Sequence, residues 1–315
     1  MVALKTTEKS ISLSEQDVGT NSFRNLLRSS PPPPSKDMLV DHTVGAKEWK
    51  ALHNEFKHQQ ETIPAFGLAV TSLKETYTKS PSDADKLIDR IYDAYIEAFP
   101  DESQRTAKQE MRDVVSDFTD ARDVLVFKDG ENIIGAIHFT AFGISYGKHA
   151  VAEYVYTDQK VARPGSGKKM VTLWEDSLRN CGFLLGAGEV NDPQLMTPAE
   201  IKLDTEGSMD PSRRVKYWDR SGYSAIEFPY GQPPLGGQSK PCNYMTLVVK
   251  FFQDRPFKSM LTDHVLEFAE GYFKTFTTRE GYQSTLDQMQ EVVGNEFAVP
   301  VTKLSSPRRY PRLKD

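Results

Sequence analysis

The sequence predicts an α/β fold in which a mixed, mostly antiparallel central sheet is flanked by helices. Three consecutive segments in the middle of the chain have strand character and are joined by short turns. Segments with helical periodicity come before and after them. Hydrophobic residues make up 38% of the 315 residues, which suffices for a substantial core.

A poorly ordered arm is expected over residues 1–45. This segment is rich in Ser and Thr and contains four consecutive prolines, Pro31 to Pro34. Proline runs favour an extended polyproline II conformation without a packed core. We interpret the arm as a tether, and a segment that binds a proline-recognising partner is the alternative.

Helices and one strand are expected between this arm and the central strands. Apolar residues recur at helical spacing over 49–56, and 65–77 is predicted as a strand. A helix is expected over 81–99, stopped by Pro100, and a second one over 103–118.

The central strands are predicted as an antiparallel meander. A short apolar run over 124–127 leads to Asp129-Gly130, which is a hairpin turn signal. Further strands are expected over 133–142 and 149–156.

After these strands, the spacing of the apolar residues is again that of a helix. Met170, Trp174, Leu178 and Cys181 lie on one helical face, and Gly182 is expected to end the helix. The segments expected after it are a strand over 183–190, a long polar loop over 191–210, a helix over 213–220, and strands over 224–229 and 244–252.

The C-terminal part is predicted as a helical extension over residues 256–300. Leu261, Val265 and Phe268 form one apolar stripe there. Residues 301–315 are expected to form a solvated basic tail.

Composition excludes several classes of protein. The net charge of -5 lacks the basic surplus that is typical of a nucleic-acid binder. No apolar run approaches ~18 residues, and the N-terminus lacks a signal-peptide core, so we expect no membrane association. Only two cysteines occur, which favours a reducing, cytoplasmic location over a disulfide framework.

Three motifs compete for residues 143–169. The first, Gly143 to Gly147, fits the G-x-S-x-G pattern of a serine hydrolase elbow. That elbow needs a strand before it and a helix after it, whereas a strand is predicted here on both sides. A hairpin loop therefore explains these residues better.

The second motif nearly fits a phosphate-binding P-loop. It runs from Ala162 to Lys169, but the position after its lysine should be Ser or Thr, whose hydroxyl holds magnesium. Lys169 occupies that position. A nucleotide-hydrolysing enzyme is kept only as a rival interpretation.

The third interpretation is an anion site that needs no metal. A strand ends, a loop containing Gly165, Ser166 and Gly167 turns, and a helix begins. Glycines let the backbone approach a phosphate, and the N–H groups of a helix N-terminus stabilise its charge. Arg163 and Lys168 add cationic groups.

The order of these elements resembles the GNAT acetyltransferase superfamily over residues 66–252. The resemblance rests on Gly165-Ser166-Gly167 before an amphipathic helix and on a second block, 213–223. That block is similar to the family's late helix, because it ends in an aromatic pair, a charged pair, one residue, a glycine and an aromatic. An acyltransferase domain over 46–255 is therefore expected.

The resemblance implies acetyl-CoA as co-substrate and direct transfer to an amine in a ternary complex, without a metal or a nucleophilic cysteine. The acceptor is a small-molecule or peptide amine that the sequence does not identify. The resemblance implies that the cofactor is bound by Val155, Arg163, Gly165, Ser166, Gly167, Lys168 and Trp218.

Some positions depart from the family pattern. Ala162 stands where Gln or Arg is usual, and Pro211 stands where Asn is common. Trp218 occupies the place of the tyrosine that often protonates the departing thiolate, and an indole cannot supply that proton. A non-catalytic acyl-CoA-binding or partner-binding module is therefore the alternative function.

Candidate acid and base groups follow from the strands. Glu153 is the first candidate base, because it alternates with Val151 and Val155 on an apolar face that would raise its pKa. A salt-bridged structural glutamate is the alternative.

Glu189, at the end of the next strand, is the second candidate base, and in the resembled fold these two strands splay apart. Asp192 could act through water. Tyr217 and Tyr223 are the candidate acids.

Overall fold

The computed structural model describes residues 44–62, 67–99, 105–207, 209–234, 241–253 and 257–314. Pro31 to Pro34 of the expected arm lie outside them. Among the described residues, no helix is long and apolar enough to cross a membrane.

A nine-stranded sheet forms the centre of the molecule, in the order β1-β2-β3-β4-β5-β7-β6-β9-β8. Every neighbouring pair is antiparallel except β4 and β5, which are parallel. The strands are β1 (Ala69–Ser72), β2 (Arg122–Asp129), β3 (Asn132–Ile144), β4 (Gly147–Thr157), β5 (Leu185–Asn191), β6 (Ser224–Ile226), β7 (Met245–Phe251), β8 (Ser259–Leu261) and β9 (Ala298–Thr302). The predicted α/β fold class, with its mostly antiparallel sheet, is confirmed.

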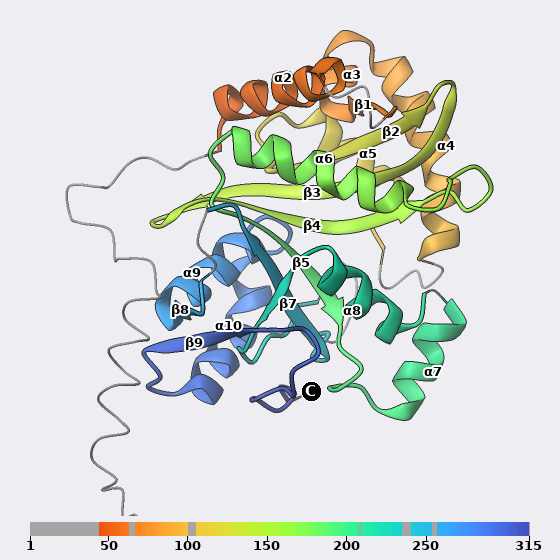
Figure 1. Cartoon of the computed structure of the whole chain (residues 1–315). Helices are drawn as coiled ribbons and strands as arrows, with labels where there is room; N and C mark the ends of the chain where they lie inside the picture. The colour runs from red at the N-terminus through yellow and green to blue at the C-terminus, as the bar shows by residue number, and fades with distance from the viewer. Residues whose placement is uncertain are drawn as a thin grey trace, which may run out of the picture.

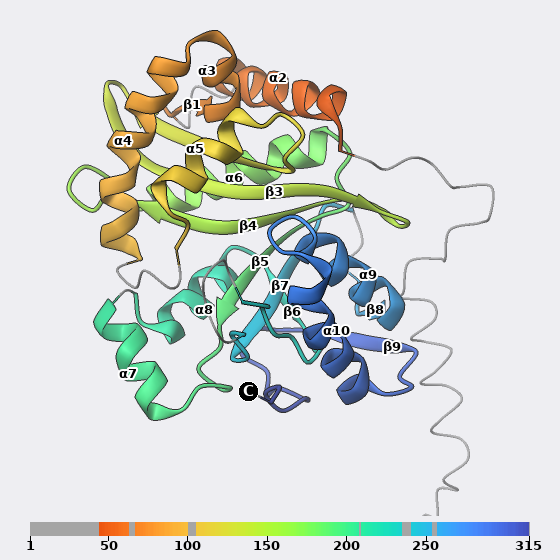
Figure 2. The ribbon, with the colours of Figure 1, turned by 180° about the vertical axis from the view of Figure 1, so that it is seen from behind.

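Helices cover both faces of the sheet (Figures 1 and 2). They are α2 (Ala46–Thr62), α3 (Leu73–Lys79), α4 (Pro81–Ala98), α5 (Lys108–Ser116), α6 (Ser166–Asn180), α7 (Pro198–Gly207), α8 (Pro211–Arg220), α9 (Thr262–Phe273) and α10 (Arg279–Val293). Helices α2, α6 and α8 lie in front of the sheet in Figure 1, whereas α4, α5, α9 and α10 lie in front of it in Figure 2. We call these the α6 face and the α9 face.

Buried apolar clusters join each layer to the sheet. One cluster contains residues of α2 and α6, including the fully buried Trp174. On the α9 face a second cluster contains residues of α9 and α10, and a third contains residues of α4 and α5. The β4–β5 pair lies at the centre of this arrangement, so any opening there has packed walls on both faces.

Local signals explain most element boundaries. The Ser80 side chain accepts a hydrogen bond from the Asp83 N–H and caps α4, with Pro81 at the first helical position. Gly130 has φ +59° in the predicted hairpin turn. Gly182, with φ +74°, follows α6 as predicted.

Two segments differ from the predictions. The strand expected over 65–77 is limited to β1, and α3 begins at Leu73 because the Ser72 side chain caps it by accepting from the Glu75 N–H. The loop expected over 191–210 contains α7. The two large apolar residues of this short helix, Ile201 and Leu203, are two positions apart and lie on different helical faces, so it lacks the apolar periodicity that would have revealed it.

The C-terminal segment contains strands in addition to the predicted helices. Its two helices are confirmed, but β8 and β9 flank them and extend the central sheet beyond β6. The tail is solvated only in part, which corrects the prediction. Leu304 and Leu313 are buried, and the Arg308 side chain is 6% exposed and forms ion pairs with Asp192 and Glu227.

Candidate active site

A cavity opens where β4 and β5 separate. The two parallel strands are paired from His149–Leu185 to Ala152–Gly188, and beyond that pair they diverge. The cavity has a volume of about 1180 Å³ and extends from Gly167, at the start of α6, to residues of α9 on the opposite face. Glu153 and Glu189, the residues directly after the last pair, both line it.

A β-bulge in β4 aims the first of these carboxylates. Phe139 pairs with Ala152 and His138 pairs with Tyr154, so Glu153 is the extra residue without a partner in β3. Such a bulge locally re-aims side chains and often lies beside an active site. Tyr154 then packs with the α4 and α5 cluster on the α9 face.

The predicted alternation of Val151, Glu153 and Val155 on one face is therefore wrong. Val151 belongs to the cluster of α9 and α10, whereas Val155 packs against the cluster of the α6 face. The bulge between them breaks the two-residue period on which the prediction depended.

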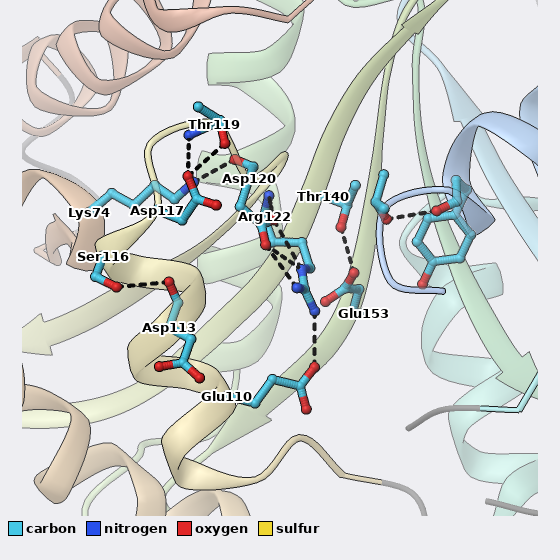
Figure 3. A network of polar contacts seen from close by, with 12 residues as sticks. Lys74, Glu110, Asp113, Ser116, Asp117, Thr119, Asp120, Arg122, Thr140 and Glu153 are labelled. Atoms are coloured by element: carbon cyan, nitrogen blue, oxygen red, sulfur yellow. Dashed lines mark hydrogen bonds and ion pairs between the residues drawn. The ribbon is translucent and has the colours of Figure 1, made fainter. Parts of the chain in front are cut away.

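Glu153 is partly buried and lies close to an ionic network (Figure 3). The Thr140 hydroxyl donates a hydrogen bond of 2.5 Å to its carboxylate. Burial raises the pKa of Glu153, and the positive charge of Arg122 opposes that rise. Arg122 itself is held by Asp120, with an Nη2–Oδ2 distance of 2.8 Å, and by Glu110 at 3.2 Å.

Glu189 has a richer set of neutral donors. The hydroxyls of Tyr230 and Tyr272 and the side-chain amide of Gln232 donate to it, at 3.0 Å for Tyr272 and 2.6 Å for Gln232. Burial raises the pKa of Glu189 to about 7, against the lowering effect of these hydrogen bonds, and the charge of Glu153 adds to the rise. A carboxylate that titrates near neutrality can accept a proton at physiological pH.

Of the predicted glycine loop, Gly167 lines the other end of the cavity, whereas Arg163, Gly165, Ser166 and Lys168 lie outside its lining. Gly165 has φ +88°, a left-handed conformation that favours glycine, and α6 begins directly after it. The Ser166 hydroxyl accepts a hydrogen bond of 3.2 Å from the Arg163 N–H, which fixes the loop. The exposed side chains of Arg163 and Lys168 lie beside this helix N-terminus, where an anion would be stabilised.

Three further predicted residues line the cavity: Val155, Tyr217 and Trp218. Gly167 lies close to Tyr217: a Cβ atom added to Gly167 would be 3.7 Å from the Tyr217 hydroxyl oxygen. That hydroxyl is buried and has no hydrogen-bond partner among the described residues. Burial raises the pKa of Tyr217.

Tyr223, the other predicted acid, lies elsewhere. Its ring packs at 4.6 Å from the Trp218 ring within the core, and it does not line the cavity. Asp192 also lies away from the cavity walls, since it is buried against Arg308.

The remaining motif of the sequence is a hairpin, as predicted. Residues 143–147 join β3 to β4, and the Ser145 hydroxyl donates to Glu267 of α9. In the described part of the chain, no group of three His, Cys, Asp or Glu side chains could hold a metal ion.

Several site residues were missed by the sequence analysis. Thr140, Tyr230, Gln232 and Tyr272 come from strands, loops and a helix far apart in the chain and meet only in the fold. No local spacing links them, and Tyr272 appears in the sequence only as part of an apolar helix.

No protein-family model and no curated protein matches the sequence. A solved structure from Bacteroides thetaiotaomicron, described as an acetyltransferase of the GNAT family, is 17% identical, with 68% of this chain and 94% of that chain covered and a TM-score of 0.42.

Two further solved structures are similar to this chain. The ribosomal-protein-S18-alanine N-acetyltransferase from Escherichia coli is 12% identical, with 60% and 96% of the two chains covered and a TM-score of 0.36. An aminoglycoside 6'-N-acetyltransferase complexed with coenzyme A is 15% identical, with 54% and 93% covered and a TM-score of 0.37.

Proposed function

We propose that this chain is an acetyl-CoA-dependent N-acetyltransferase that acts by direct transfer in a ternary complex. The observation that carries the proposal is the position of Glu153 and Glu189. They follow directly on the last paired residues of β4 and β5, in a cavity that joins a helix N-terminus on one face to a chamber on the other.

The residues present fit coenzyme A. The loop of Gly165, Ser166 and Gly167 would bind the pyrophosphate, with Arg163 and Lys168 adding positive charge. Val155 and Trp218 would line the path of the pantetheine arm between the strands. The cavity volume exceeds the usual ~300–1,000 Å³ of a small-molecule site, which leaves room for a second substrate.

In this proposal Glu189 is the general base. Acetyl-CoA supplies the activated acetyl group: the amine nitrogen bonds to the acetyl carbon, the carbon–sulfur bond breaks, and coenzyme A leaves as the thiolate. Glu189 accepts the proton that the amine loses, because its pKa near 7 leaves much of it ionised at neutral pH. Glu153, favoured from the sequence, has the weaker case as base because the positive charge of Arg122 opposes the rise in its pKa.

Tyr217 is proposed to stabilise the departing sulfur. Tyr217 lines the cavity, and its buried hydroxyl near Gly167 has no partner among the described residues, so it would donate a hydrogen bond there. The pKa of a tyrosine, ~10, already exceeds that of a thiol, ~8.5, and burial raises the pKa of Tyr217 further, so full proton transfer from Tyr217 is unfavourable. The thiolate would therefore take its proton from water while Tyr217 remains a hydrogen-bond donor.

A thermal-shift titration tests the proposal first. We expect coenzyme A to stabilise the full chain without magnesium, because a ligand that binds only the folded state raises its stability. Stabilisation by ATP with magnesium but not by coenzyme A would instead indicate the P-loop alternative. Acetyl-CoA and a panel of amines should then give free thiol, and Glu189→Gln should abolish its release without weakening coenzyme A binding.

A non-catalytic acyl-CoA-binding module is the second candidate. It is favoured by Trp218, which stands in place of a proton-donating tyrosine, and by the raised pKa of Tyr217. It predicts the same stabilisation by coenzyme A, but no release of thiol with any amine.

A further inference from the structure

The chamber on the α9 face is distinct from the glycine-loop end of the cavity. Its walls come from the end of α4, from α5, from β2, from the loop before β7 and from α9. Because the glycine loop and Tyr217 belong to the opposite end, this chamber is the place for the acceptor. Its chemistry should therefore indicate the class of amine.

The cationic side chains of the chamber are already engaged. Arg122 donates to Asp120 and to Glu110, so its positive charge is balanced by two carboxylates (Figure 3). Arg105 donates a hydrogen bond of 3.1 Å to the carbonyl of Phe99, at the end of α4. The guanidinium of Arg122 is therefore not left to bind an anionic acceptor.

The two carboxylates of the cavity, those of Glu153 and Glu189, are hydrogen-bonded only by neutral groups within the described ranges of the chain. Glu189 accepts hydrogen bonds from two tyrosines and one amide, and Glu153 accepts one from Thr140. All these donors are neutral, and neither glutamate forms an ion pair with any residue that the structure describes. Arg122 is the cation that acts on Glu153, but Asp120 and Glu110 share its charge, so the chamber carries more negative than positive charge when both glutamates are ionised.

Aromatic rings complete the chamber. Phe99 and Tyr154 lie with ring centroids 5.1 Å apart, and Tyr272 and Phe276 lie 5.0 Å apart. All four residues line the cavity. Ring faces attract cations and pack against alkyl chains, so these walls suit an alkyl ammonium rather than an anion.

We infer that the acceptor is a small alkyl diamine, whose second ammonium group is bound by Glu153 while the reacting nitrogen faces Glu189. The inference rests on the proposed function. Glu153 and Glu189 come directly after the last pair of β4 and β5, where neighbouring strands lie about 4.8 Å apart, and both line the cavity, so one short molecule can contact both. Glu153 thus determines specificity, and the proton transfer remains with Glu189.

Calorimetric titration of the full chain with amines tests the inference without requiring turnover. We would compare 1,4-diaminobutane with butylamine, with and without coenzyme A, at mildly alkaline pH, where carboxylates are ionised and alkylamines stay protonated. The diamine should bind about tenfold to a hundredfold more tightly, the usual worth of a charge-assisted hydrogen bond.

Variants test whether the preference for the diamine comes from Glu153 itself or from the overall negative charge of the chamber. Glu153→Gln should abolish the preference for the diamine, and Thr140→Val, which removes the hydroxyl that orients Glu153, should reduce it severalfold. Glu97→Gln is the matched control, because this carboxylate is half exposed at the cavity rim and pairs with Lys160. It should keep the preference.

Equal affinity for the two amines, no binding of the diamine, or a preference that survives Glu153→Gln in the folded protein would overturn the inference. Failure of the proposed function gives a different result. In that case coenzyme A does not bind, or acetyl-CoA gives no thiol with any amine, whatever the calorimetry shows.

Discussion

Replacing Arg308 by methionine removes the cation of a buried ionic cluster and keeps most of the apolar stem. Arg308 pairs with Asp192 and with Glu227, and the exposed fractions of the three side chains are 6%, 1% and 4%. The variant leaves two carboxylates buried without their partner. Breaking a buried pair in this way costs about 3–5 kcal/mol of folding free energy.

Urea denaturation measures this effect. With an m value of about 3 kcal/mol/M, the midpoint should fall by about 1–1.7 M while m stays unchanged. Arg309→Met is the control, because Arg309 pairs with Glu296 at the surface, where the side chains are 49% and 30% exposed. That exposed pair should contribute at most ~1 kcal/mol.

A loss below about 1 kcal/mol for Arg308→Met, or equal losses for the two variants, would refute the reasoning. It would mean that the C-terminal tail contributes little to the stability of the fold. The expected result would show that the tail is an integral part of the core around β9.

Three further predictions concern the site. The rate of amine acetylation should rise with pH through about 7, because Glu189 accepts a proton only when it is ionised. A flat pH–rate profile would contradict the role of Glu189 as base. Glu189→Gln should lower kcat by about 10²–10⁴-fold. Tyr217→Phe should lower kcat by about tenfold to a hundredfold with the dissociation constant of coenzyme A unchanged, and an unchanged kcat would exclude its contact with the leaving sulfur. Gly165→Ala should lower the free energy of unfolding by about 1–2 kcal/mol. The cost comes from backbone strain alone, since φ is +88° and no atom lies within 4 Å of the added Cβ. Thermal unfolding measures it, and an unchanged melting temperature would contradict the prediction.

The sequence predicted the elements with strong local signals. The meander of β2, β3 and β4 follows from a turn signal between apolar runs, and α6 follows from its apolar face and from Gly165 and Gly182. Strand β9 was missed because it is short, half exposed and contains Pro300. Its position depends on partners in β6 and β8 that no local pattern identifies.

The site was predicted only in part for the same reason. Glu153 and Glu189 could be proposed as carboxylates at the ends of neighbouring strands, but the bulge that aims Glu153 depends on the register between β3 and β4. The pKa of Glu189 near 7 depends on burial and on Tyr230, Gln232 and Tyr272, which only the tertiary fold brings together.

The most direct test of the account is a single-turnover assay that follows the acetylated amine by mass spectrometry, with the full chain, acetyl-CoA and 1,4-diaminobutane. We expect a product that is heavier than the amine by one acetyl group and is formed together with one equivalent of thiol. The Glu189→Gln variant should still bind coenzyme A but form almost none of this product. An enzyme that binds coenzyme A but forms no acetylated product with any amine, or a Glu189→Gln variant as active as the unaltered chain, would contradict it.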